Sequence, residues 1–114
     1  MDSVETYRAI VRRVLTEFVE FVGVPLRCGE PRHLTVCDGE HDRYLVVVTG
    51  WDRLRRVHYI VIQLDIIDGK IWIQCDNTDI VVARDLERAG VPKKDIVLGF
   101  QPPEVRPLTE YAVA

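Results

Sequence analysis

The strongest constraint on the fold is a series of four apolar runs in the middle of the chain. They are rich in Val, Ile, Tyr and Trp and cover His33–Asp38, Arg43–Trp51, Arg56–Ile67 and Lys70–Asp76. This composition is typical of β-strands. The segments between the runs are too short for a crossover helix, so each strand must pair antiparallel with the next. The sequence therefore predicts a four-stranded antiparallel meander.

The third link of this meander, Asp68-Gly69, also predicts the register. An Asp-Gly pair between apolar runs is typical of a type I′ turn, in which both central residues have positive φ. Ile67 then faces Lys70, and uninterrupted pairing continues to Val61 and Asp76. One face of the hairpin then carries Ile62, Leu64, Ile66, Ile71, Ile73 and Cys75. The other carries Val61, Gln63, Asp65, Trp72, Gln74 and Asp76.

The N-terminal segment Val4–Val22 has the apolar spacing of an amphipathic helix. Asp2 and Glu5 are spaced as in a capping box, and Arg13 and Glu17 as an i,i+4 ion pair. We expect this helix to cover the apolar face of the sheet. Its predicted apolar stripe consists of Tyr7, Ile10, Val11, Val14, Leu15, Phe18, Phe21 and Val22.

The last third of the chain predicts shorter elements. A helix is expected from about Ile80 to Ala89 with Gly90 as its cap, then a short helical piece from Pro92 to Leu98 closed by Gly99. Three prolines after Gln101 indicate an extended tail that can pair at a sheet edge near Tyr111–Val113. The predicted fold class is α+β: an N-terminal helix packed on a four-stranded antiparallel β-meander, followed by short C-terminal helices and an extended tail. The length of the chain predicts that residues 1–114 form one domain.

Composition limits the class of protein. Fifteen basic against 18 acidic residues give a net charge of -3, which argues against a domain whose main task is to grip nucleic acid. The cysteines, Cys28, Cys37 and Cys75, are odd in number and lack CxxC spacing, so a reducing environment is expected. The N-terminus shows no signal-peptide pattern, and no apolar stretch reaches the ~20 residues of a membrane span. We therefore expect a cytoplasmic location.

One group of residues has partial metal-ligand character. Cys28, His33 and Cys37 follow a C-x4-H-x3-C spacing, and His41 lies four residues further on. Close-paired cysteines, which zinc sites usually contain, are missing. We therefore favour a core-facing Cys37 thiol with surface histidines, and a turn contact between Asp38 and His41. No metal ligand is predicted.

A second group suggests nuclease chemistry. Asp68-Gly69-Lys70 matches the acid-x-lysine step of many Mg²⁺ nucleases, and Asp65, Asp76 and Asp79 lie nearby. In the predicted register, however, the first motif is a tight turn, and Asp65 lies about 13 Å along the strand from Asp76. No nucleophilic or phosphate-binding motif is present. We therefore predict no catalytic residue and no cofactor.

The most distinctive surface segment is the predicted hairpin tip, Trp51–Arg56. Trp51, Arg53, Arg55 and Arg56 could stack on bases and contact phosphates, or form a protein-binding hot spot. The same composition also fits a solvated loop with the tryptophan folded over the sheet edge. The acidic chain favours a protein over DNA as the partner.

Several strings together resemble the XisI family. They are Asp65–Gln74 with the core DGKIWIQ, Thr78-Asp79, Gly90–Phe100 (GVPKKDIVLGF), the ending Thr109–Ala114 (TEYAVA), Tyr7-Arg8, and Trp51 with the basic run to Val57. The resemblance spans nearly the whole chain, although the connector from Cys28 to His33 matches no motif. It implies an α+β fold without known catalytic residues. It further implies an accessory role in excision of the fdxN element of cyanobacteria, with an XisH-like companion and a site-specific recombinase.

Three hypotheses follow, in order of preference. The first is a non-enzymatic regulator that binds a partner protein. Arg106, Thr109 and Glu110, polar residues on an irregular tail, are then candidate contacts beside the hairpin tip. The second is direct DNA binding through the tip arginines, together with Arg8, Arg12 and Arg13. The third is a Mg²⁺-dependent nuclease. A homo-oligomer formed through an open sheet edge is compatible with all three.

Overall fold

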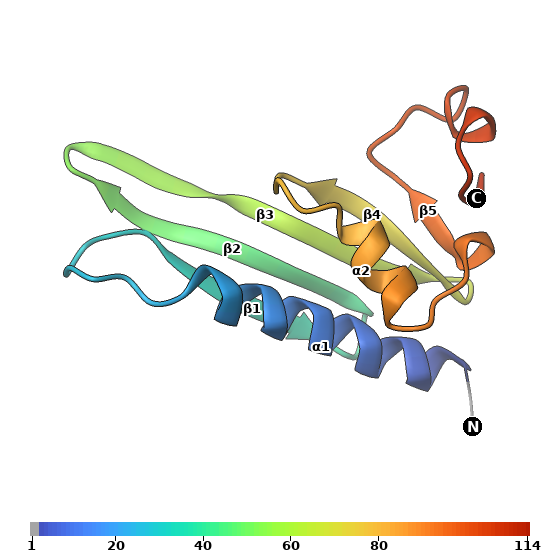
Figure 1. Cartoon of the computed structure of the whole chain (residues 1–114), viewed down its shortest axis with the longest axis horizontal. Coiled ribbons are helices and arrows are strands. Elements are labelled where there is room, and N and C mark those ends of the chain that lie inside the picture. Colours follow the sequence, from blue (N-terminus) through green and yellow to red (C-terminus); the bar gives the residue numbers. More distant parts are fainter. Residues whose placement is uncertain (1–2) are drawn as a thin grey trace.

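The computed structural model describes residues 3–114, which form a single sheet with helices on one side (Figure 1). The elements in chain order are α1 (Ser3–Val22), β1 (Arg32–Asp38), β2 (Arg43–Asp52), β3 (Arg55–Ile67), β4 (Lys70–Asp76), α2 (Val82–Arg88), the 3-10 turn η1 (Lys93–Asp95), β5 (Ile96–Leu98) and the 3-10 turn η2 (Arg106–Leu108). The α+β class and the N-terminal helix are confirmed. No helix in this described part is long and apolar enough to cross a membrane.

The sheet contains one strand more than the sequence predicts. Its order is β1-β2-β3-β4-β5, with the first four strands antiparallel and β5 parallel to β4. The predicted helix over Pro92–Leu98 is wrong beyond its first turn, since only Lys93–Asp95 is helical. Ile96 and Val97 are fully buried as strand residues. Three consecutive aliphatic residues bury more surface at the open edge of β4 than one short helical turn could cover.

The tail follows the edge of this added strand. Val97 forms an isolated parallel bridge with Ala112, and the Ala112 N–H donates to the Ile96 carbonyl at 2.9 Å. The expected edge pairing near Tyr111–Val113 is therefore confirmed. The second helix is also confirmed, although it is shorter than predicted, and Gly90 follows it with φ of 110°.

The β3–β4 register agrees with the prediction only near the turn. Asp68 and Gly69 have φ of 50° and 78°, as a type I′ turn requires. Pairing follows the predicted register up to Leu64 opposite Ile73, after which a bulge shifts it by one residue. The predicted partners of Gln63, Ile62 and Val61 are therefore wrong. The observed pairs are Gln63 with Cys75 and Ile62 with Asp76.

A second bulge lies on the other side of β3. Val46 pairs with Ile62 and Val47 with Ile60, so Val61 is the extra residue. Val61 and Ile62 are both buried, because a bulge lets two consecutive side chains point to the same side. Towards the hairpin tip the alternation of β3 is consequently inverted. Even-numbered residues face the helices after Val61 and the opposite side before it.

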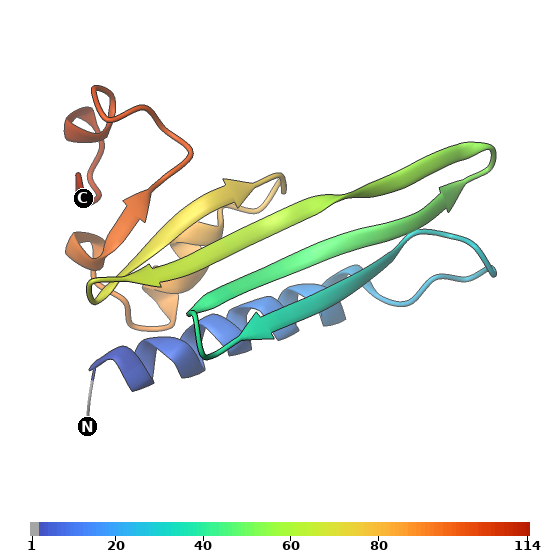
Figure 2. The ribbon, with the colours of Figure 1, turned by 180° about the vertical axis from the view of Figure 1, so that it is seen from behind.

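Both helices pack on the same sheet face, and the view from behind shows the other face without a helix (Figure 2). The α1 side chains Tyr7, Ile10, Val11, Val14, Leu15 and Phe18 are buried, as predicted. Phe21 and Val22 are exposed instead, Phe21 by 77%. The prediction is wrong there because α2 packs beside earlier turns of α1, which leaves Phe21 at the rim of an open groove. The ion pair between Arg13 and Glu17 is present at 3.8 Å, whereas Asp2 of the predicted capping box lies outside the described residues.

The molecule is elongated, with extents of 42 × 34 × 24 Å. Beyond α1, α2 and the start of β1, β2 and β3 continue as a two-stranded hairpin arm, which we define as residues 50–57 (Figure 1). The connector 23–31 runs beside this arm. The tail occupies the opposite end of the molecule.

Candidate protein-interaction surface

The hairpin arm brings together the four tip residues singled out in the sequence. Trp51 pairs with Arg56 across the two strands and is 48% exposed. The Arg56 guanidinium lies 5.3 Å from the centroid of the Trp51 ring and also donates to the Gly50 carbonyl (3.3 Å) and to Thr49 Oγ1 (3.2 Å). The tryptophan is thus held beneath an arginine, with one half of its surface open to solvent.

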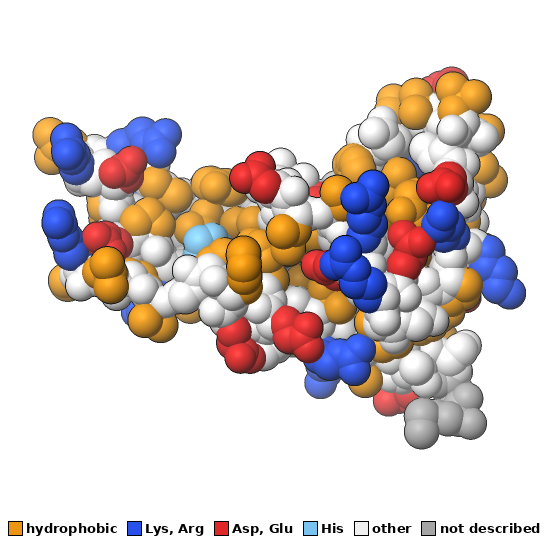
Figure 3. Space-filling model, viewed as in Figure 1, with side chains coloured by type: hydrophobic (Ala, Val, Ile, Leu, Met, Phe, Trp, Pro, Cys, Tyr) orange, Lys and Arg blue, Asp and Glu red, His pale blue; other side chains and the backbone are white. Residues whose placement is uncertain are grey.

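The end of the arm is open on all sides. Arg53 has a positive φ of 57° in the turn, and Leu54 is 96% exposed. Arg55 lies 3.6 Å from Asp52 in an exposed ion pair, which contributes little to stability. Figure 3 shows Lys and Arg side chains gathered at this end with hydrophobic groups beside them. Aromatic and arginine side chains of this kind are enriched in protein-binding hot spots.

The connector 23–31 supports the base of the arm. The Trp51 N–H donates to the Gly29 carbonyl at 2.8 Å. A Cβ atom on Gly50 would lie 2.6 Å from Pro31 Cα and 2.9 Å from the Glu30 carbonyl oxygen. Only glycine allows this backbone approach, so the arm projects in a defined direction.

The tail residues Arg106, Thr109 and Glu110 lie at the other end and make contacts within the chain. The Arg106 guanidinium lies 5.0 Å from the centroid of the Trp72 ring and donates to the Gln101 carbonyl at 3.1 Å. Thr109 Oγ1 donates to the Arg106 carbonyl at 2.8 Å. Glu110 pairs with Lys93 at 3.2 Å and is the most exposed of the three. The tail therefore contains structural contacts that the sequence did not reveal.

The arginines of α1 are also engaged within the chain. Arg8 makes a two-pronged contact with Asp42, at 2.8 and 3.0 Å, and also pairs with Glu5. The Tyr44 hydroxyl donates to Asp42 at 2.9 Å, and Arg12 lies over the Tyr44 ring. The hydrogen bond from Arg8 holds the pKa of Asp42 below its usual range. This cluster ties α1 to the β1–β2 turn.

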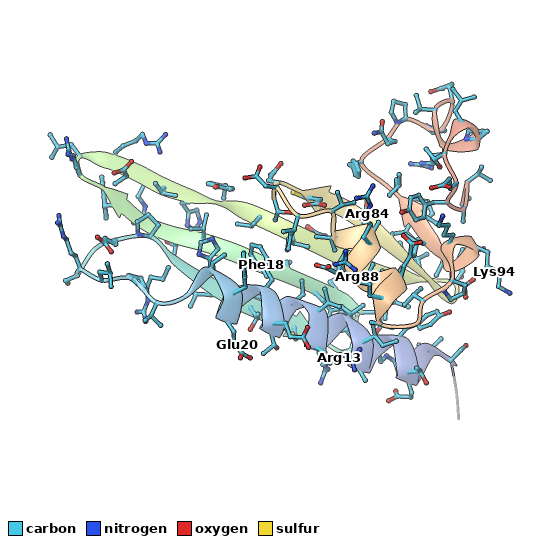
Figure 4. The ribbon with its side chains drawn as sticks, in the orientation of Figure 1. Arg13, Phe18, Glu20, Arg84, Arg88 and Lys94 are labelled. Atoms are coloured by element: carbon cyan, nitrogen blue, oxygen red, sulfur yellow. The ribbon has the colours of Figure 1, made fainter. Side chains whose placement is uncertain are left out.

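A groove of about 770 Å³ runs between α1 and α2. Apolar residues, among them Val14, Phe18 and Ile80, line its floor. Figure 4 labels Arg13 on α1 and Arg84 and Arg88 on α2, which flank it. Glu17, Asp79 and Asp85 balance these cations, so the groove favours neither sign of charge. Sequence analysis missed this groove because it assigned Phe21 to the core.

The residues with metal-ligand character do not come together. Cys28 is exposed on the connector. Cys37 is exposed too, contrary to prediction, because β1 is the edge strand of the sheet. The expected turn contact between Asp38 and His41 is present at 2.8 Å. Within residues 3–114, no three His, Cys, Asp or Glu side chains are grouped to hold a metal ion.

The residues that suggested nuclease chemistry have structural roles, either in a turn or in hydrogen bonds within the chain. Asp68 and Gly69 form the type I′ turn. Asp65 accepts hydrogen bonds from Gln63 (3.2 Å) and Gln74 (3.3 Å). Asp76 accepts one from the Val82 N–H at the start of α2 (3.1 Å).

Comparison with known proteins agrees with this description. The family of the XisI protein matches residues 1–113. The chain belongs to the XisI family. Among solved structures, the fdxN element excision controlling factor XisI from Anabaena variabilis has 33% identity and a TM-score of 0.85, covering 99% of this chain and 100% of that one. An XisI-like protein from the same organism has 36% identity and a TM-score of 0.87 with the same coverage. Among curated protein sequences, none matches.

Proposed function

We propose that this XisI-family chain is a non-enzymatic accessory protein that controls site-specific excision of a DNA element by binding other proteins. The observation that carries this proposal is the match over residues 1–113 to a family in which a solved member is an fdxN element excision controlling factor. The partners are an XisH-like companion and, indirectly, a recombinase and its DNA. With all three cysteines unpaired, the reducing cytoplasm is the proposed location.

The hairpin arm is the proposed contact with the companion. It offers a half-exposed tryptophan braced by Arg56, an exposed leucine at its tip, and the arginines Arg53 and Arg55. Such a surface buries aromatic area against a partner while its arginines form directional hydrogen bonds. The tail residues Arg106, Thr109 and Glu110 are a second proposed contact. Glu110 is the most exposed of the three, so its carboxylate is the group most accessible to a partner.

Copurification of the two chains tests this proposal. We expect the XisH-like companion to bind the wild-type chain, and Trp51→Ala to weaken binding by about 30-fold or more, which corresponds to the hot-spot threshold of about 2 kcal/mol. Arg53→Ala/Arg55→Ala removes two exposed cations from the arm. The matched control, Arg88→Ala/Lys94→Ala, removes two from the opposite end. Two folded chains that fail to associate would refute the proposal. A loss of binding confined to the control would move the contact to the end of the molecule formed by α2 and η1.

Direct DNA binding is the alternative that the arm arginines favour. Its signature is an affinity that falls steeply with salt, because each phosphate contact releases counterions. A titration with a DNA fragment carrying the end of the element, at several salt concentrations, measures it. If Arg53→Ala/Arg55→Ala/Arg56→Ala leaves any DNA affinity unchanged, the arm does not contact DNA.

The nuclease alternative has a simple measurement. The purified chain is incubated with DNA and Mg²⁺ beside a preparation from cells carrying the empty vector. We expect equal, background cleavage in both. Cleavage above the control that Asp65→Asn abolishes would replace the proposed regulator with an enzyme.

A further inference from the structure

The sheet face that no helix covers, which is turned towards the viewer in Figure 2, carries an exposed patch of aliphatic side chains. Pairing places Leu34, Val47 and Ile60 in one row across β1, β2 and β3, and Val36, Leu45 and Gln63 in the next. Leu34, Val36 and Ile60 are 45%, 47% and 39% exposed. Ile60 belongs to this face only because the bulge at Val61 inverts the alternation of β3. A contiguous aliphatic patch of this kind marks an interaction site.

Charged rows of opposite sign border the patch at its two ends. Towards the arm, the next row is Arg32, Thr49 and His58, followed by Trp51 and Arg56. These rows contain two arginines and no acid. At the other end, the row Asp38, Arg43 and Asp65 has one more acid than base. Along the strands, this face therefore carries a basic row, two rows of mainly aliphatic side chains, and an acidic row.

We propose that this face binds a second copy of the chain through a two-fold axis that runs across the strands between the two aliphatic rows. Rotation about this axis reverses the order of the rows along the strand direction. The Leu34 row of one copy then packs on the Val36 row of the other, and each basic end meets an acidic end. A two-fold interface requires such a self-complementary surface, and opposite charges at facing positions select this orientation over the parallel one.

The outline of the sheet fits the same arrangement. β4 ends at Asp76 opposite Ile62, so only β1, β2 and β3 extend further towards the arm. The tail, which stands beside β4 and β5 at the far end, is thereby placed beside the narrow arm of the second copy (Figure 2). The four rows on three strands cover a flat area of roughly 400 Å², from strand spacings of about 4.8 Å and rises of about 3.3 Å. This is about half of the roughly 800 Å² per partner of a standard interface, so we expect a weak, reversible dimer.

Sedimentation equilibrium from about 1 to 200 μM tests the proposal. We expect a reversible monomer–dimer equilibrium for the wild-type chain. Val47→Glu should raise the dimer dissociation constant by about 100-fold or more, because it places an unpaired charge in the middle of the interface. The matched control, Phe21→Glu, introduces the same charge at an exposed apolar position on α1, on the opposite side of the sheet, and should leave the equilibrium unchanged. Circular dichroism verifies that both variants are folded.

Cysteine crosslinking tests the orientation. The two-fold axis brings residue 45 of one copy opposite residue 47 of the other. In a background with Cys28, Cys37 and Cys75 changed to Ser, a short bis-maleimide should crosslink a mixture of Leu45→Cys and Val47→Cys chains far faster than either chain alone. A crosslinker is needed because stacked sheets lie about 10 Å apart, whereas a direct disulfide requires Cα atoms within about 7 Å. Three results would each overturn the proposal. The first is a wild-type chain that is strictly monomeric at 200 μM. The second is a dimer that Val47→Glu does not weaken, as expected for pairing through the edge of β1, and the third is crosslinking of either cysteine variant with itself.

Discussion

The covered end of the molecule and the hairpin arm are built from the same two strands, β2 and β3, but they differ in how deeply their side chains are buried and in the kinds of side chain that they carry. Under α1 and α2, residues such as Tyr44, Val46 and Leu64 are fully buried and surrounded by apolar side chains. In the arm, Trp51, Leu54 and the arginines are exposed. The burial of apolar surface that stabilises the fold is therefore concentrated at one end. The other end is free to present aromatic and cationic groups to a partner.

The largest expected effect is the loss of a core side chain at the covered end. Leu64→Ala should lower the free energy of unfolding by about 2–5 kcal/mol, since Leu64 is fully buried and its removal leaves a cavity. Leu54→Ala, the same change at the arm tip, should cost less than about 0.5 kcal/mol. Urea denaturation measures both. Similar losses at the two sites would show that the arm belongs to the core.

A smaller effect is expected where the arm meets its connector. Gly50→Ala should cost about 1–3 kcal/mol, because the new methyl group would overlap the backbone of Glu30 and Pro31. Gly69→Ala is the control, since no atom lies within 4 Å of its Cβ position and only its positive φ is unfavourable. Thermal or urea unfolding compares the two. If Gly50→Ala proved the milder change, the connector would not brace the arm.

The smallest expected effect depends on pH and concerns the contact between α1 and the β1–β2 turn. Arg8 lowers the pKa of Asp42 below its ordinary value of 3.8. The ionised carboxylate therefore stabilises the fold above about pH 4, and this contribution is lost as the pH falls through the lowered pKa.

Asp42→Asn keeps the shape and removes the charge. It should cost about 1 kcal/mol at pH 7, and progressively less below pH 4. Unfolding curves at pH 7, 5 and 3 measure the difference from wild type, with Asp52→Asn in the exposed arm as the control. A cost that did not change with pH would assign the role of Asp42 to its backbone conformation, which has a positive φ of 53°.

Much of the fold was predictable because its signals are local. The helix period of residues 4–22, the Asp68-Gly69 turn and the four strand runs depend on neighbouring residues alone. The misassigned elements depend on distant ones. Ile96–Leu98 became a strand because the edge of β4 was open to it. Phe21 was left exposed because α2 packs beside earlier turns of α1.

The candidate surfaces divide in the same way. The sequence showed that Trp51 and the tip arginines are close together, since a hairpin joins them. It did not show that Arg106 packs on Trp72, because the two lie on separate segments that only the folded tail brings together. The α1–α2 groove was missed for the same reason.

By itself, the sequence determined the class of the fold, the antiparallel order of its first four strands, the exposed arm tip and the resemblance to the XisI family. Tertiary structure alone decided the two bulges, one at Val61 in β3 and one at Gln74 in β4. The bulge in β3 forms because burying Val61 beside Ile62 outweighs regular pairing, and no local pattern records that balance. The bulge at Val61 also decided which residues of β3 complete the aliphatic patch on the uncovered face. The surface proposed for a second copy is thus a consequence of packing in the core.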